Sequence, residues 1–171
     1  MIMNAQEAKA VATAMAAVWE GEIPATLRVL AAVSDDKRDY KPHPKSRSAW
    51  ELVTHIATAD AWFIDSIAKG AFAFDAEKTR EAEAQFANVA DVVAWYEKTV
   101  PAMLQQLRDM PAEQLAETVD FFGMAQLPRA QWIGSATTHS IHHRGQLSAY
   151  LRGMGCRVPD IYGPSGDAEQ G

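Results

Sequence analysis

Two histidines, His139 and His143, lie four residues apart in the last third of the chain. On an α-helix this spacing places both imidazole rings on one face, about one turn apart, where they can share a metal ion. His55 is the third candidate ligand, because helical spacing puts it on the same apolar stripe as Leu52 and Ala59. Helical bundles build metal sites from core-facing side chains of separate helices. The pattern therefore predicts a site made of three histidines.

Three neutral imidazoles and one water would form an open tetrahedral site, with nitrogen to zinc distances of ~2.0 to 2.1 Å. An ion held in this way can activate water for attack on a substrate, because it lowers the pKa of the water towards about 7. Nickel, copper and iron also accept imidazole ligands. The ligand types alone do not select one metal.

Two simpler interpretations remain open for these histidines. The spacing of His139 and His143 also arises by chance, and a lone histidine such as His55 among apolar residues is usually a hydrogen-bonded core residue. All three, however, fall on stripes that the periodicity predicts to be buried. Burying three unpaired imidazoles is costly, whereas one shared cation satisfies them together. A purely structural bundle and a non-catalytic metal- or ligand-binding protein are the alternatives to an enzyme.

Other polar and aromatic side chains are expected near the histidines. Glu51 lies one turn before His55, where it can act as a base, orient an imidazole, or simply cap the helix. The candidate substrate-pocket residues share the stripes that carry the histidines, and they are Trp62, Trp132, Gln146 and Tyr150. His142 points away from His139 and His143, so we expect it to stay outside the coordination sphere.

The elements that position these residues are helices. Apolar periodicity predicts four long helices over residues 5–33, 48–70, 88–107 and 128–154, with no convincing strand pattern. Ser48 and Glu51 form a capping-box pattern, and Gly70 is a natural C-terminal residue. Pro24 predicts a kink or a break in the first helix. Residues 34–47 read as a loop, 71–87 as a charged crossover connection, and 111–115 as a short extra turn.

These elements predict an all-α protein, a four-helix bundle with a long connection between helices two and three. Its 171 residues suit one domain spanning residues 1–171, with residues 165–171 frayed. A net charge of -6 argues against a nucleic-acid partner. The single cysteine, Cys156, makes the cytoplasm the expected location, and the apolar stretch 10–19 is too short to span a membrane.

The segment His139-Ser140-Ile141-His142-His143-Arg144-Gly145-Gln146, with residues 150–152 and 158–163 after it, resembles the C-terminal signature of the DinB/YfiT-like family. Residues 48–56 resemble the second helix of that family, which carries a single histidine. The order of the helices and the long second connection agree as well. The resemblance therefore extends over nearly the whole chain.

The resemblance implies a four-helix bundle that holds a divalent metal, most often nickel or zinc. The family's ligands fall on His55, His139 and His143, and all three positions are filled. Members of the wider superfamily include thiol-dependent S-transferases and isomerases, while others are described as hydrolases. Homodimers are common among them, so a homodimer is expected here.

The resulting hypothesis is a metal-dependent hydrolase or S-transferase. In it, a three-histidine ion activates water or a low-molecular-weight thiol for attack on a small electrophilic substrate. A thiol cofactor carries carboxylates and needs a cationic anchor, for which Arg144 and Arg152 are the candidates. The alternative is a non-catalytic stress-response protein that binds a metal or a small ligand.

Overall fold

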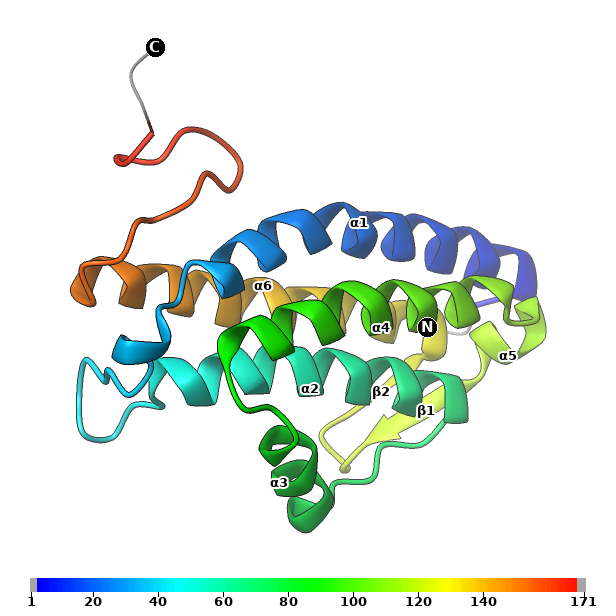
Figure 1. Cartoon of the computed structure of the whole chain (residues 1–171). Helices are drawn as coiled ribbons and strands as arrows, with labels where there is room; N and C mark the ends of the chain where they lie inside the picture. Colours follow the sequence, from blue (N-terminus) through cyan, green and yellow to red (C-terminus); the bar gives the residue numbers. More distant parts are fainter. Residues whose placement is uncertain (1–2, 169–171) are drawn as a thin grey trace.

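The computed structural model describes residues 3–168, and its main feature is a bundle of four long helices (Figure 1). These helices are α1 (Ala5–Ala31), α2 (Ala49–Lys69), α4 (Val89–Asp109) and α6 (Arg129–Gly153). The shorter elements are the 3-10 helix η1 (Asp35–Lys37), α3 (Ala76–Ala84), α5 (Ala112–Ala116), β1 (Thr118–Phe121) and β2 (Ala125–Pro128). The prediction of an all-α four-helix bundle is confirmed, with a minor two-stranded sheet added.

Each of α1 and α2 packs against both α4 and α6, so α1 and α2 occupy opposite corners of the bundle. Helices α2 and α4 run in the same direction (Figure 1). The chain must therefore return along the bundle between them, which explains the long second connection. Within residues 3–168, no helix is both long enough and apolar enough to cross a membrane.

The ends of α2 follow the sequence prediction. The Ser48 side chain accepts a hydrogen bond from the Glu51 amide, and the Glu51 side chain accepts one from the Ser48 amide, which completes a capping box. Gly70 ends the helix with φ of 75°, a conformation that favours glycine. The Arg129 guanidinium occupies the space that a Cβ at Gly70 would fill. This close contact gives a second reason for glycine there.

Three local features differ from the sequence prediction. Helix α1 continues through Pro24 as one helix and curves along its length instead of breaking into two (Figure 1). The connection 71–87 contains a helix, α3. The β1–β2 hairpin is also an addition, with Thr118 paired to Pro128, and its turn places Phe122 and Gly123 at positive φ. Four-residue strands are too short to produce a readable alternation.

The chain after α6 is held by hydrogen bonds as far as Asp167. The Ser165 hydroxyl donates to the Val158 carbonyl, and its amide donates to the Asp160 carboxylate. Asp167 accepts from the Val158 amide and from Arg152. Residues 165–167, which we expected to be frayed, are thus tied back, and residues 169–171 of that expected tail lie outside the described residues.

Asp60 of α2 is a fully buried carboxyl group at the centre of the bundle. Its Oδ2 accepts hydrogen bonds from Tyr96 of α4 at 2.7 Å and from Ser140 of α6 at 2.8 Å. The Trp19 side chain of α1 lies close enough to the Asp60 carboxyl group to lower its pKa. Neither Trp19 Nε1 nor Asp60 Oδ1 meets the distance and angle criteria for a hydrogen bond among the described residues. One side chain thereby connects all four helices.

Burial governs the ionisation of Asp60. Loss of hydration raises its pKa from 3.8 to about 7, against the opposing effect of the hydrogen bonds from Tyr96 and Ser140. The carboxyl group therefore holds a proton in the folded protein at pH values where the unfolded chain has released it.

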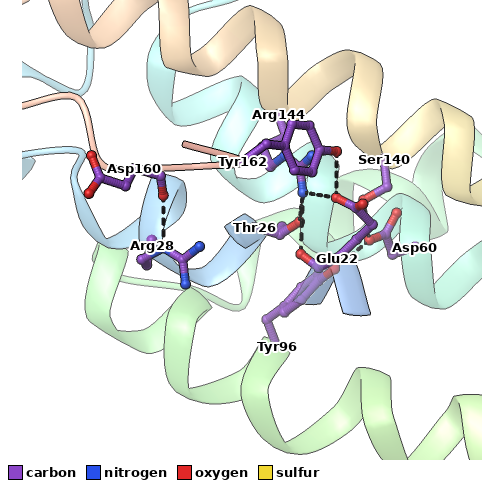
Figure 2. Close-up of polar contacts among 9 residues, drawn as sticks. All are labelled: Glu22, Thr26, Arg28, Asp60, Tyr96, Ser140, Arg144, Asp160 and Tyr162. Atoms are coloured by element: carbon purple, nitrogen blue, oxygen red, sulfur yellow. Dashed lines mark hydrogen bonds and ion pairs between the residues drawn. The ribbon is translucent and has the colours of Figure 1, made fainter. Parts of the chain in front are cut away.

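Arg144 of α6 forms a second buried polar cluster, on the α1 side of the bundle (Figure 2). It is 2% exposed, and its Nη1 lies 2.6 Å from the Glu22 carboxylate. Its Nη2 donates to the Tyr162 hydroxyl, which in turn donates to Glu22 at 2.7 Å. Arg28 of α1 donates to the Asp160 carbonyl. These contacts fasten the chain after α6 to α1.

We expect Asp60→Asn to change how stability depends on pH. The folded pKa of Asp60 lies above the unfolded value, so its stabilising contribution is complete below pH 4 and is lost as the pH rises through 7. Wild-type stability relative to the variant should fall across this range, by up to about 1.4 kcal/mol per pH unit. Urea denaturation of both chains at a series of pH values measures this difference. Parallel curves would contradict it.

We expect Arg144→Ala to lower the free energy of unfolding by about 3 to 5 kcal/mol, because it leaves the Glu22 carboxylate without its buried partner. Arg28→Ala is the matched control, since Arg28 is exposed and also reaches the chain after α6. Its effect should stay below about 1 kcal/mol. Chemical denaturation measures both variants. An equal decrease in the free energy of unfolding would show that the buried ion pair contributes no more stability than the exposed contact.

Candidate metal centre

The structure brings His55, His139 and His143 together between α2 and α6. One ring nitrogen from each lies within 4.8 Å of the other two. The ring centroids are 5.3 Å apart for His55 and His139, 4.6 Å for His55 and His143, and 4.5 Å for His139 and His143. Nitrogens bound to one ion at ~2.1 Å in tetrahedral geometry lie roughly 3.4 Å apart. A small inward movement of the rings would therefore complete such a site.

The protonation states of the three rings suit a cation. Burial is the main cause that lowers the pKa of His55 to about 3 and that of His139 to about 4. Burial also lowers the pKa of His143, although the hydrogen bond that its ring donates to Gln146 partly offsets this effect. The positive charge of Arg47 lowers all three pKa values further. The imidazoles are thus neutral at pH 7, with lone pairs available to a metal.

The hydrogen bonds of the rings also fit metal binding. His143 Nδ1 donates to Gln146 Oε1 at 3.1 Å, which leaves Nε2 as the ligand atom. The Gln146 amide nitrogen donates in turn to the Tyr150 hydroxyl at 3.3 Å. The buried His139 Nδ1 has no hydrogen-bond partner among the described residues. An unpartnered buried nitrogen in a ring that faces two other imidazoles is consistent with a metal ligand.

The other two histidines lie outside the cluster. His142 is exposed, and only its ring edge approaches His143, with a centroid distance of 4.9 Å. His43 is exposed in the loop before α2, where its Nδ1 accepts from the Lys45 amide. Neither belongs to the three-histidine group.

Glu51, the base suggested by the sequence, is exposed and already engaged. It accepts the Ser48 amide in the helix cap and forms an ion pair with Lys41 at 3.2 Å. The backbone hydrogen bond is the main cause that lowers its pKa. A second carboxyl group, Glu83 of α3, lies within electrostatic reach of Glu51 and Arg47, and burial raises its pKa.

A cavity of about 980 Å³ opens beside the histidines, with His55 and His139 in its wall. Its wall comes from α2, α3, α4, α6 and the β1–β2 hairpin, together with the segment between α2 and α3. Figure 1 shows α3 and the hairpin on the same side of α2, away from α1. The Trp62 indole donates to the Ala73 carbonyl at 3.1 Å and so ties that segment to α2.

Of the four residues expected in the pocket, Trp62 lies in the wall of this cavity and the other three do not. Trp132 is buried behind the wall, where its ring packs on Phe121 and its Nε1 donates to the Val119 carbonyl. Tyr150 is buried against Tyr40, further along α6. Gln146 reaches the three-histidine group through its hydrogen bond with His143.

Comparison with known proteins identifies relatives of the chain. The family model described as "DinB family" matches residues 3–170. The chain is 36% identical over 123 residues to the uncharacterized protein YjoA of Bacillus subtilis strain 168, covering 72% of this chain and 77% of YjoA. It is 30% identical over 153 residues to the uncharacterized protein YrdA of the same organism, covering 86% of this chain and 85% of YrdA.

Two solved structures share the fold. The crystal structure of the DinB-like protein YjoA from Bacillus subtilis has a TM-score of 0.67 and 25% identity, covering 88% of this chain and 99% of YjoA. A DinB-like protein from Bacillus cereus ATCC 10987 has a TM-score of 0.70 and 21% identity, covering 86% of this chain and 95% of the Bacillus cereus chain. The match of the family model to residues 3–170, together with the 30% identity to YrdA over 86% of the chain, shows that the chain belongs to the DinB family.

Proposed function

We propose that the protein is a metal-dependent enzyme in which His55, His139 and His143 hold one divalent cation. A small electrophilic substrate would occupy the adjoining cavity. The observation that carries this proposal is the meeting of three neutral imidazoles, of which His55 and His139 lie in the wall of that cavity. A metal bound there would lower the pKa of a water molecule, so that a nucleophile is available near pH 7.

The residues of the chain have defined tasks in this proposal. The three imidazoles supply lone pairs, and Gln146 orients the His143 ring through its hydrogen bond. A substrate that packs on the aromatic part of the cavity wall would displace water from the reacting groups, which would strengthen the electrostatic interactions made there. With only nitrogen ligands, zinc and nickel are the proposed metals.

Water is the favoured nucleophile because the suggested anchors for a thiol cofactor are engaged elsewhere. Arg144 is buried in its ion pair with Glu22. Arg152 pairs with Asp167 at 2.7 Å. Neither arginine lines the cavity. Transfer from a low-molecular-weight thiol is therefore the second candidate.

An enzyme is favoured over a non-catalytic binder by the number of protein ligands. Within residues 3–168, the histidine cluster contains three ligating side chains and no fourth His, Cys, Asp or Glu. Catalytic zinc sites commonly keep one position for water or substrate, whereas structural sites are closed by four protein ligands.

We expect alanine substitution of His55, His139 or His143 to lower zinc affinity about a hundredfold or more. Loss of a direct ligand should cost at least as much as the 10- to 100-fold typical of its hydrogen-bond partners. Untagged protein is titrated with zinc in competition with a chromophoric chelator, and elemental analysis gives the stoichiometry. His142→Ala is the matched control, because it removes a neighbouring histidine outside the cluster. Unchanged zinc affinity in all three variants would refute the metal site.

The choice between water and thiol can be tested with two electrophiles. We expect zinc-loaded protein to hydrolyse 4-nitrophenyl acetate without any thiol, at least about tenfold faster than the His139→Ala variant. Reaction of 1-chloro-2,4-dinitrobenzene with several low-molecular-weight thiols should show no enzyme-dependent acceleration. Acceleration seen only when a thiol is present would favour S-transfer over hydrolysis.

A further inference from the structure

We infer that the cavity beside the histidines binds an uncharged aromatic molecule, with its reacting group at the end formed by His55 and His139. This inference rests on the proposed function for its reacting end and adds the class of substrate. It stands on the composition, charge and shape of the cavity wall.

Aromatic rings form a large part of the wall of the cavity. Trp62, Phe63, Phe74, Phe121 and Phe122 all line it. The Phe63 ring lies 4.9 Å from Trp62 and stacks with Phe121 at 6.4 Å between centroids. Rings arranged in this way offer flat faces and edges to a flat apolar ligand.

Two of these rings are exposed to solvent at the cavity. Phe74 is 65% exposed and Phe122 is 47% exposed. Large apolar side chains that remain exposed together in a concave site commonly mark a ligand-binding surface. Phe74 belongs to the α2–α3 connection, and Phe122 belongs to the turn between β1 and β2. A ligand in the cavity would cover these rings and remove them from water.

The charges in the wall are paired with one another. Lys69 lies 2.6 Å from Asp65, and Lys78 lies 3.8 Å from Asp75, with all four residues in the lining. The described lining therefore offers two cations and two anions in neutralising pairs. An anionic ligand would meet the Asp65 and Asp75 carboxylates as well as the two lysines and would gain no net attraction, whereas a neutral ligand leaves both pairs unchanged.

The aromatic part of the cavity wall continues up to the three histidines. The Phe63 ring lies 5.0 Å from His139, between the cluster and the rest of the cavity. Ala59 lies one helical turn after His55 and also lines the cavity, so a methyl group is all that its side chain places there. A flat ligand that packs on Phe63 would thus extend towards the histidines.

The volume of the cavity suits a ligand of this class. About 980 Å³ falls at the upper end of the ~300 to 1,000 Å³ range of small-molecule sites. A two-ring aromatic molecule fits within it and leaves space for a reacting group beside the histidines.

The test uses 2-naphthamide and 2-naphthoate, two probes of the same shape that differ in charge. Binding to the full-length chain is measured by calorimetry after treatment with a chelator, so that the carboxylate cannot bind a metal. We expect 2-naphthamide to bind at least about tenfold more tightly, since the carboxylate of 2-naphthoate loses hydration in an aromatic site that offers it no unpaired cation among the described lining. Equal binding of the two probes, or tighter binding of 2-naphthoate, would overturn the inference.

Two variants locate the binding. Ala59→Trp should weaken 2-naphthamide binding at least about tenfold by filling the end next to His55, while Ala149→Trp, an exposed position on α6 outside the lining, should leave it unchanged. Phe74→Ala changes an exposed side chain and so is not expected to impair folding. It should weaken binding roughly threefold or more. Wild-type affinity in both lining variants would overturn the inference.

A parallel zinc titration separates this inference from the proposed function. Zinc binding without 2-naphthamide binding would refute the aromatic site and leave the metal site in place. Binding of 2-naphthamide without zinc binding would support the aromatic site and refute the metal-dependent enzyme.

Discussion

The geometry of the site depends on one buried carboxyl group. Asp60 accepts hydrogen bonds from α4 and α6 while it lies on α2, and α2 and α6 are the helices that carry the three histidines. Its partner Ser140 directly follows His139. A hydrogen bond with these partners constrains how α2 can slide or rotate against α6, because a shift by one residue would separate donor and acceptor. The polar contact in the core thereby keeps His55 opposite His139.

The segment 139–146 of α6 places functional side chains on two faces of the helix. His139 and His143 face α2, whereas Arg144 faces α1 and holds Glu22 and Tyr162 (Figure 2). The sequence motif therefore combines two of the clustered histidines with a residue that fastens α6 to α1. The sequence suggests Arg144 as an anchor for a thiol cofactor, but in the structure it is a buried cation paired with Glu22. Hydrophobic periodicity could not reveal this, because an arginine is rarely placed in a core without a partner.

Local rules predicted the parts of the fold that local chemistry determines. The cap at Ser48, the end at Gly70 and the shared face of the histidines follow from short-range spacing. The cavity could not be predicted in this way, because its wall combines α2 with segments such as 71–75 and the hairpin turn. Periodicity predicts which face of α6 is buried, but it does not predict how far along that face the cavity extends. Trp132 and Tyr150 consequently lie beyond it.

The return of the chain from α2 to α4 has a consequence for how such a protein diversifies. The three histidines lie on the packed helices α2 and α6. Much of the cavity wall beside them comes from α3, from the segment before α3 and from the β1–β2 hairpin. Helix α3 has no buried residue, so replacements there do not disturb the core. Gene duplicates can thus exchange the outer walls and acquire a new chemical repertoire, while the inherited imidazoles stay in place.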